Sequence, residues 1–451
     1  MKQTAYKHYL LIVLLVTQTS NYTDGVSLGL LLQSIKDDLR LADTQLGLLT
    51  GIAFALFYSV MGIPIARWAD RGNRVKILAL STALWSVMVA LCGTAVNFVH
   101  LLLIRVGVAV GEAGCTPPAH SLIPDYFARS ERPRAVAIYM LAGPLSTIVG
   151  YSLAGWLNEF YGWRVTFFVL GLPGLALAAL VWLTLREPRC SGASVGRVAQ
   201  MTSGGGPAPA AHARASSQSS VREVCTTLGS NRTFRYLLLS FCVMFFFSTG
   251  MSQWQPAFLI RSFGLKTGEI GIWLALIYGV GGIVGTYAGG TLAVRLAASN
   301  ESLQLKGMAV ALGIFCLAST AEFLAPHAYA AFAAMIVGAV GGAAMSGPLF
   351  ATIQTLVPER MRAMAIALIY FFANLIGTGL GPLAVGAMSD ALRPLWSDES
   401  LRYALLMLCP GYLLGTWFLW RASRSVGEDL QAARNHVSAA ARIRSADSAP
   451  I

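Results

Sequence analysis

Twelve apolar stretches, each about as long as a membrane-crossing helix, dominate the sequence of 451 residues. About 20 helical residues cross the roughly 30 Å hydrocarbon core of a bilayer. Hydrophobic residues make up 55% of the chain and charged residues only 12%, too few for the surface of a soluble domain. The sequence therefore predicts an all-α polytopic membrane protein whose approximate spans are 8–33, 44–66, 75–96, 98–123, 135–158, 164–185, 233–260, 268–296, 304–324, 328–356, 363–389 and 402–421.

The first stretch begins like a signal peptide, because Lys2 and Lys7 precede the run YLLIVLLV. A secretory signal also needs a small-x-small cleavage site after its apolar core. No such site follows. We therefore expect this stretch to remain as the first span.

Basic residues are distributed unevenly along the chain. With both termini inside, 25 of the 33 Lys and Arg fall in cytoplasmic segments, 7 fall in outside loops and Arg105 lies within a span. This asymmetry follows the positive-inside rule and predicts cytoplasmic termini in a cell membrane, specifically a bacterial inner membrane. The net charge of +12 is thus assigned to orientation and not to nucleic-acid binding. The seven cysteines stand singly, without CxxC spacing, so we expect no metal or cofactor.

One octapeptide occurs twice, as ERPRAVAI at 131–138 and ERMRAMAI at 359–366. Each copy leads into the fifth apolar stretch of its half, which indicates an internal duplication of a six-span unit. A Gly/Ser/Pro/Ala-rich segment separates the halves and cannot bury enough apolar surface to offset its ordering entropy. The predicted domains are an N-terminal bundle at 1–187, a flexible cytoplasmic linker at 188–231, a C-terminal bundle at 232–422, and a poorly ordered cytoplasmic tail at 423–451.

A charged loop, ARWADRGNRVK, follows the second stretch at 66–76. It resembles the signature loop of the major facilitator superfamily, Gly-x-x-x-Asp-Arg-x-Gly-Arg-Arg/Lys. Asp70, Arg71 and Arg74 match this pattern, whereas Ala66 and Asn73 replace its glycines. The variant is similar to the spinster-like branch of that superfamily, and so are LADTQLGLLTGIAF, RVGVAVGEAGCTPPAHSLIPDYF, YGWRVTFFVLGLPGL and LREP.

The resemblance implies a secondary transporter with twelve helices in two pseudo-symmetric six-helix bundles. Such proteins work by alternating access around a cavity lined by the first, fourth, seventh and tenth helices. It also implies that Asp70, Arg71 and Arg74 form a cytoplasmic gate, pairing with neighbouring helix ends in the outward-open state. The alternative is that these charges serve topology alone. In the second half, GGTLAVRLAASN resembles a decayed copy of the loop, with Val294 in place of the aspartate.

Three charged residues, Asp24, Arg105 and Glu112, lie inside predicted spans. A charge near mid-bilayer costs at least about 2.5 to 3.5 kcal/mol on insertion scales, so each needs a structural reason. Arg105 and Glu112 are seven residues apart, which places them within about 20° on one helix face and about 10 Å apart along it. Asp24 and Arg105 lie at similar depth, roughly 10 to 14 Å below the outer edge, and can therefore pair.

These groups predict proton coupling. Desolvation and a nearby arginine shift a carboxyl pKa in opposite directions, so a carboxyl that changes surroundings can exchange a proton near neutral pH. The hypothesis makes Glu112 the main proton carrier and Asp24 a second titrating site. Arg105, which can bind an anionic group bidentately, would receive the substrate. The alternatives are a static ion pair between two helices and a protonated, hydrogen-bonded Glu112.

The second half offers amide and aromatic groups in place of charges. The predicted substrate-binding residues there are Gln253, Trp254, Tyr278, Tyr370 and Asn374, with packing as the alternative for each. A charged N-terminal wall and an aromatic C-terminal wall suit an amphipathic organic anion.

Other functional classes fit the sequence less well. The chain has no nucleotide-binding loop of a primary pump, no nucleophile motif of an enzyme and no repeated polar rings of a channel. The expected protein is a monomer that contacts membrane lipids, protons and an anionic substrate. That substrate is either lysolipid-like or a small aromatic or other carboxylic acid, and the direction of transport stays open.

Overall fold

The computed structural model describes residues 3–188, 231–297, 300–356 and 371–447, together with Gly229, Ala365, Leu368 and Ile369. The predicted linker lies almost entirely outside these residues, as does all of the second octapeptide except Ala365. Every regular element in the described part is helical, which confirms the all-α prediction.

The described residues of the first half, 3–188, form eight helical segments. The second, fourth and fifth predicted spans are each divided between two of them, and most of the fifth is joined to the sixth in one long helix. That helix turns at Gly162, whose φ of 79° lies in the left-handed region that favours glycine. The segments are α1 (Gln3–Leu39), α2 (Asp43–Thr50), α3 (Ile52–Arg71), α4 (Arg74–Cys92), α5 (Phe98–Ala113), α6 (Thr116–Tyr126), α7 (Arg132–Met140) and α8 (Ala142–Thr184).

The second half contains further long helices with two π-helical segments, a form often found at functional sites. The elements are α11 (Arg232–Phe263), α12 (Thr267–Leu274), η1 (Ala275–Val280), α13 (Gly281–Ala297), α14 (Glu301–Leu324), α15 (Ala328–Leu356), η3 (Ala373–Thr378), α17 (Gly379–Trp396), η4 (Ser397–Glu399), α18 (Ser400–Leu408) and α19 (Gly411–Asp447).

Eight helical stretches in the described part are long and apolar enough to cross a membrane. Two of them, Arg132–Thr184 and Ala373–Asp429, each cover two of the predicted spans. Helix α1 and the apolar segment Ala328–Ala344 coincide with the remaining two. Each predicted span therefore falls on a helix, wholly or in its described part.

The described residues form two compact units. Unit 1 holds 3–188, Thr249–Val280 and Thr378–Ala404, and unit 2 holds the other described residues. Parts of α11 and α18, and all of α12, η1, α17 and η4, thus belong with the N-terminal helices. The division into two six-helix bundles at the linker stays a prediction.

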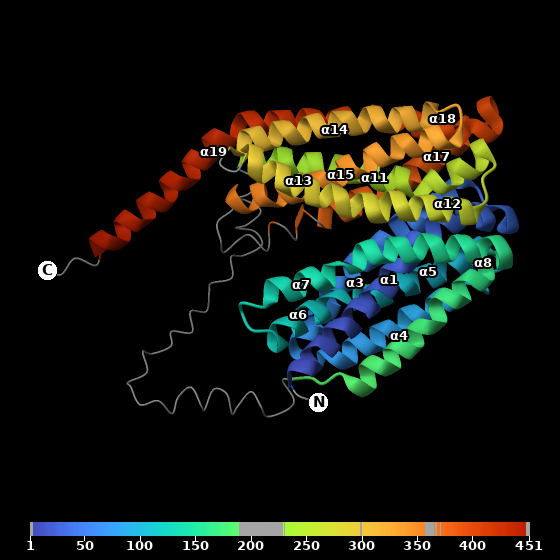
Figure 1. The fold of residues 1–451 in the computed structure, drawn as a ribbon, viewed down its shortest axis with the longest axis horizontal. Coiled ribbons are helices and arrows are strands. Elements are labelled where there is room, and N and C mark those ends of the chain that lie inside the picture. The colour runs from blue at the N-terminus through green and yellow to red at the C-terminus, as the bar shows by residue number, and fades with distance from the viewer. Residues whose placement is uncertain are drawn as a thin grey trace. The chain divides into compact units, whose positions relative to one another are not determined.

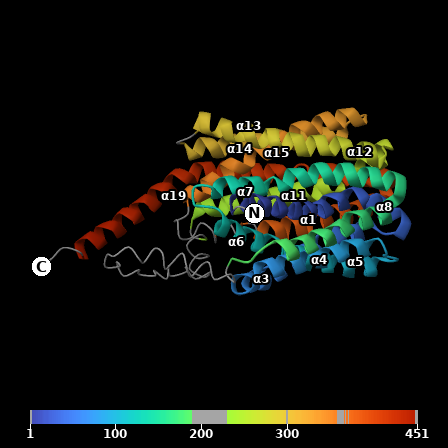
Figure 2. The ribbon, with the colours of Figure 1, turned by 60° about the horizontal axis from the view of Figure 1, so that its bottom comes forward.

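Unit 1 is packed through small residues. Helix α8 lies along both α1 and α4, and α4 lies along α5, as the blue to green ribbons of Figures 1 and 2 show. A Cβ at Gly111 of α5 would lie 2.6 Å from the backbone nitrogen of Trp85, and one at Gly171 of α8 would lie 2.5 Å from the backbone nitrogen of Ala90. These glycines permit the close helix contacts that stabilise bundles in lipid.

In unit 2, α13 and α14 both pack on α15 (Figure 1). A Cβ at Gly285 or Gly289 of α13 would collide with the α15 backbone, so both positions need glycine. Helix α19 continues to Asp447, so the predicted tail is helical up to that residue. Its alanine-rich sequence favours helix, and Asp429 anchors it by accepting the Thr233 N–H at 2.8 Å.

Candidate functional site

Asp24 and Arg105 form a buried ion pair between α1 and α5. The Nη1 atom of Arg105 lies 2.5 Å from Oδ2 of Asp24, and the side chains are 3% and 1% exposed. The guanidinium also lies 5.5 Å from the Phe54 ring centroid. The structure thus brings together two of the sequence-predicted site residues. Because removing one partner leaves a buried charge uncompensated, such pairs are sensitive to any change in their surroundings.

Glu112 lies on the same helix as Arg105 and is buried. Among the described residues, its Oε1 atom has no hydrogen-bond partner. Oδ1 of Asp24 and Nε of Arg105 are likewise buried and without hydrogen bonds in the described part. Buried polar atoms are normally satisfied. The two carboxyl oxygens are therefore suited to accept a hydrogen bond from water or a polar ligand group, and the Nε–H of Arg105 is suited to donate one.

Two further residues share the helix face of Asp24: Asn21 precedes it by three residues and Thr17 by seven. Oγ1 of Thr17 and Nδ2 of Asn21 are also buried without a hydrogen-bond partner in the described structure. Sequence reasoning missed both, although their helical spacing from Asp24 was a usable signal. The polar face of α1 thus includes Thr17 and Asn21 as well as Asp24.

Three of the predicted substrate residues of the second half lie in unit 1. Trp254 is fully buried and donates its indole N–H to the Pro382 carbonyl at 3.0 Å, so it is a packing residue in this conformation. Tyr278 donates its hydroxyl to Gln255 at 2.5 Å and lies 6.5 Å from Tyr151, ring to ring. Gln253 is half-buried.

The other two predicted substrate residues lie elsewhere. Asn374 is half-buried in the π-helical segment η3 of unit 2. Tyr370 lies outside the described residues.

Arg74 of the signature loop is completely buried at the start of α4. Its Nη2 atom pairs with Glu187 and lies 2.6 Å from Oδ2 of Asp125. Its Nη1 donates to the Ser121 carbonyl at 2.8 Å, and its backbone N–H donates to Glu187 at 2.7 Å. Arg74 thus ties α4 to the ends of α6 and α8.

The remaining two residues of the predicted gate, Asp70 and Arg71, are exposed at the end of α3. Glu187 belongs to the LREP motif, and sequence reasoning assigned it no role. The linear sequence gave no sign that it would meet Arg74, because 113 residues separate the two.

The first octapeptide forms the N-terminus of α7, with Glu131 directly before the helix. Lys7 of α1 donates to Oε1 of Glu131 at 2.6 Å. This hydrogen bond, supported by the backbone N–H of Ala128, holds the pKa of Glu131 below its usual value. The Lys7–Glu131 contact therefore links α1 to the start of α7.

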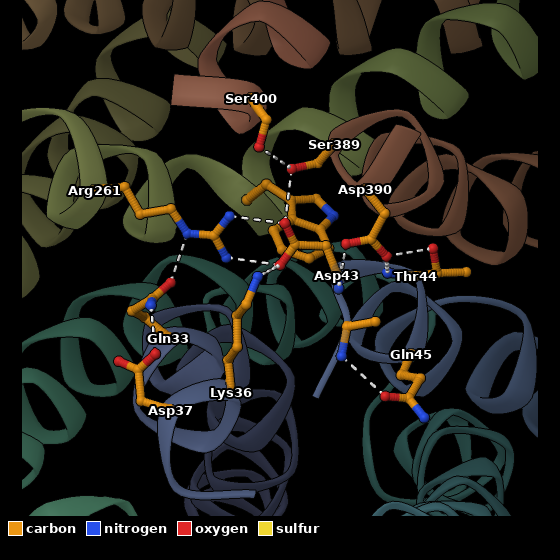
Figure 3. Close-up of polar contacts among 12 residues, drawn as sticks. Gln33, Lys36, Asp37, Asp43, Thr44, Gln45, Arg261, Ser389, Asp390 and Ser400 are labelled. Carbon is orange, nitrogen blue, oxygen red and sulfur yellow. Dashed lines mark hydrogen bonds and ion pairs between the residues drawn. The ribbon is translucent and has the colours of Figure 1, made fainter. Parts of the chain in front are cut away.

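A second charged cluster lies where α1 ends and α2 begins, which we call the outer end of unit 1 after the predicted orientation (Figure 3). Asp43 is only 2% exposed there. Arg261 of α11 binds both of its carboxylate oxygens at 2.8 Å, and Lys36 lies 2.5 Å from Oδ1. Ser389 of α17 donates to Oδ2 at 2.7 Å. Sequence reasoning missed this cluster, because Lys36, Asp43 and Arg261 fall between predicted spans, where exposed charges are expected.

Comparisons with known proteins agree on one family. A model described as the Major Facilitator Superfamily matches residues 13–382. The chain is 32% identical over 422 residues to an MFS-type efflux pump of Mycolicibacterium smegmatis, covering 93% of each protein. It is 24% identical over 408 residues to a probable L-galactonate transporter of Escherichia coli, covering 88% of this chain and 85% of that one.

Among solved structures, the chain resembles a bacterial homolog of the human lysosomal transporter Spinster in an inward-facing, unoccupied conformation. The TM-score is 0.81 at 30% sequence identity, and the match covers 94% of this chain and 98% of that one.

Proposed function

Since this chain belongs to the major facilitator superfamily, in its spinster-like branch, we propose that it carries an amphipathic organic anion across the membrane by alternating access coupled to protons. It is a multi-pass membrane transporter. The proposed setting is a bacterial inner membrane with both termini cytoplasmic, in accordance with the distribution of Lys and Arg.

The observation that carries the coupling is the buried group of Asp24, Arg105 and Glu112. An ion pair and a separate carboxyl in one membrane-embedded site are costly for folding, so function is the default explanation. When the site opens to water on one side, Glu112 can exchange a proton there. When the site is closed, Glu112 has only fixed neighbours, and the proton is carried across.

Arg105 provides the anion site. Its Nε atom has no hydrogen-bond partner among the described residues, while Nη1 is held by Asp24. A carboxylate or phosphate of the substrate can therefore accept a hydrogen bond from Nε, and arginine is suited to bind such groups. Substrate binding would then compete with Asp24 for the same cation, which links substrate entry to the state of the carboxyl.

Two classes of substrate fit an arginine in this position. A lysolipid-like anion is the candidate that the spinster-like membership favours. Its acyl chain would need an apolar path beside the site of the charged head. A small carboxylic acid is the second candidate, favoured by the similarity to the probable L-galactonate transporter. Thermal unfolding of the purified protein with lysophosphatidylglycerol, benzoate or galactonate separates these classes.

We expect one of these probes to raise Tm by several degrees, since a ligand at 100 times its Kd stabilises by about 2.7 kcal/mol. Arg105→Ala should abolish that rise, and Arg105→Lys, which keeps the charge but loses the fork, should weaken it. Arg164→Ala is the matched control, because Arg164 forms an exposed ion pair with Asp38 at 2.8 Å. A rise that survives unchanged in Arg105→Ala would exclude Arg105 as the anion site.

A further inference from the structure

The Asp43 cluster joins the two halves of the sequence. Lys36 and Asp43 belong to the first half, whereas Arg261 and Ser389 belong to segments 249–280 and 378–404 of the second. Arg261 also donates from Nε to Gln33 of α1 at 2.7 Å (Figure 3). A nearly buried carboxylate with two cations and a hydroxyl is a strong interaction only while all partners stay in place.

Beside this cluster, a carboxylate of the second half caps a helix of the first. Asp390 of α17 accepts the backbone N–H of Asp43 at 3.1 Å and that of Thr44 at 2.7 Å. It also accepts the Thr44 hydroxyl at 2.7 Å. The N-terminal N–H groups of a helix have no partner within the helix and carry partial positive charge, so a carboxylate there is stabilising. Helix α2 thus receives its cap from the other half of the chain.

The reverse arrangement occurs at α12, a helix of the second half. Glu159 of α8 accepts the backbone N–H of Gly268 at 3.0 Å and lies 3.5 Å from Nζ of Lys266. Thr267 donates its hydroxyl to the Gly155 carbonyl at 3.1 Å and accepts a bond from Asn158 at 3.3 Å. Here the first half provides the cap and the second half provides the helix.

The two caps share one spacing. A Cβ at Gly47 of α2 would lie 2.5 Å from the Pro382 carbonyl oxygen, and the capping Asp390 follows Pro382 by eight residues. A Cβ at Gly271 of α12 would collide with the Tyr151 carbonyl, and the capping Glu159 follows Tyr151 by eight residues. In both cases a glycine at the fifth helical residue allows the backbones to touch, and the acid two turns further on reaches the helix start.

We infer that these reciprocal caps, together with the Asp43–Arg261 pair, form the clamp that closes the outer end during the transport cycle. The inference rests on alternating access as proposed above and adds the residues that hold one state. Opening the outer end separates every cross-half contact at once, because Arg261, Ser389 and Asp390 leave Asp43 and Thr44 while Gly268 leaves Glu159. Lys36, on the same half as Asp43, stays with it.

The clamp is tested by distances between spin labels at the outer end, measured in liposomes. Val96 follows α4 and is 70% exposed, and Leu395 lies at the end of α17 and is 72% exposed. Neither residue takes part in the clamp. Both would be replaced by labelled cysteines. Five of the native cysteines are buried, and the other two, Cys190 and Cys225, would be changed to serine.

We expect a dominant short distance in the otherwise unchanged chain. Arg261→Gln and Asp390→Asn should each lower the ratio of short-distance to long-distance populations by about tenfold or more, because each removes charge-assisted hydrogen bonds across the halves. Arg164→Gln is the matched control. It breaks an exposed ion pair at the same end, between α8 and α1 of one half, and should leave the ratio unchanged.

If Arg261→Gln and Asp390→Asn behave like Arg164→Gln, the clamp is refuted. Should Arg261→Gln fail to fold, Glu159→Gln carries the same expectation, since it weakens one cap and leaves the Asp43 cluster intact. The measurement needs no substrate and no pH gradient. If the variants shift the distances but the wild type shows no proton-driven uptake, the proposed coupling is refuted and the clamp is supported. If uptake is proton-driven but the variants leave the distances unchanged, the clamp is refuted and the coupling is supported.

Discussion

Glu112→Gln is expected to abolish proton-driven accumulation of substrate while leaving exchange intact. Glutamine keeps the size of the side chain and its capacity for hydrogen bonds but cannot carry a proton. With one proton per substrate, a gradient of one pH unit supports roughly tenfold accumulation in liposomes, because one unit corresponds to about 1.36 kcal/mol. The variant should lose all of this accumulation. Counterflow of labelled against unlabelled substrate needs no net proton movement and should continue.

The control for this experiment is Glu301→Gln, at the first residue of α14 and outside the buried group. We expect that variant to accumulate substrate like the wild type. Wild-type accumulation in Glu112→Gln would remove Glu112 from the coupling mechanism. Loss of both accumulation and counterflow would point to a role of Glu112 in substrate binding or in the conformational change itself.

Arg74→Ala is expected to destabilise the protein by about 3–5 kcal/mol, the usual cost of removing one partner of a buried ion pair. The substitution leaves Glu187, whose side chain is 2% exposed, without its cation and removes the tie between α4 and the ends of α6 and α8. The free energy of unfolding in mixed micelles measures the effect directly.

Arg71→Ala provides the comparison, since Arg71 lies three residues away and is exposed. Its substitution should change the free energy of unfolding by no more than about 0.5 kcal/mol. Equal effects of the two substitutions would show that Arg74 acts through general charge and not through its buried contacts. Glu187→Gln should reproduce much of the Arg74→Ala loss, because it removes the same pair from the other side.

Local properties of the chain were enough to predict the helices. Length and apolarity of a stretch decide whether it can cross a bilayer, and both can be read residue by residue. The twelve predicted spans therefore coincide with helices in the described part. The polar composition of the tail predicted poor order but not its conformation, and its alanines and arginines favour the helix that continues to Asp447.

The buried charges occupy an intermediate position. Depth along a helix follows from the rise per residue, so the sequence placed Asp24 and Arg105 at the same level, and the structure joins them at 2.5 Å. The same reasoning could not find Thr17 and Asn21 as members of the polar group. Whether a hydroxyl or amide is satisfied depends on neighbouring helices, which no local pattern specifies.

By itself, the sequence determined the class of protein, the number of spans and the depth of its unusual charges, because these depend on hydrophobicity and helical geometry alone. Only the tertiary structure decided the partners. Asp43 meets Arg261 from 218 residues away, and Thr44 meets Asp390 from 346 residues away. Such contacts form only where the packing of unit 1 brings two helix ends together, at glycines that let the backbones touch. The packing therefore decides whether a carboxylate forms an ion pair or caps a helix.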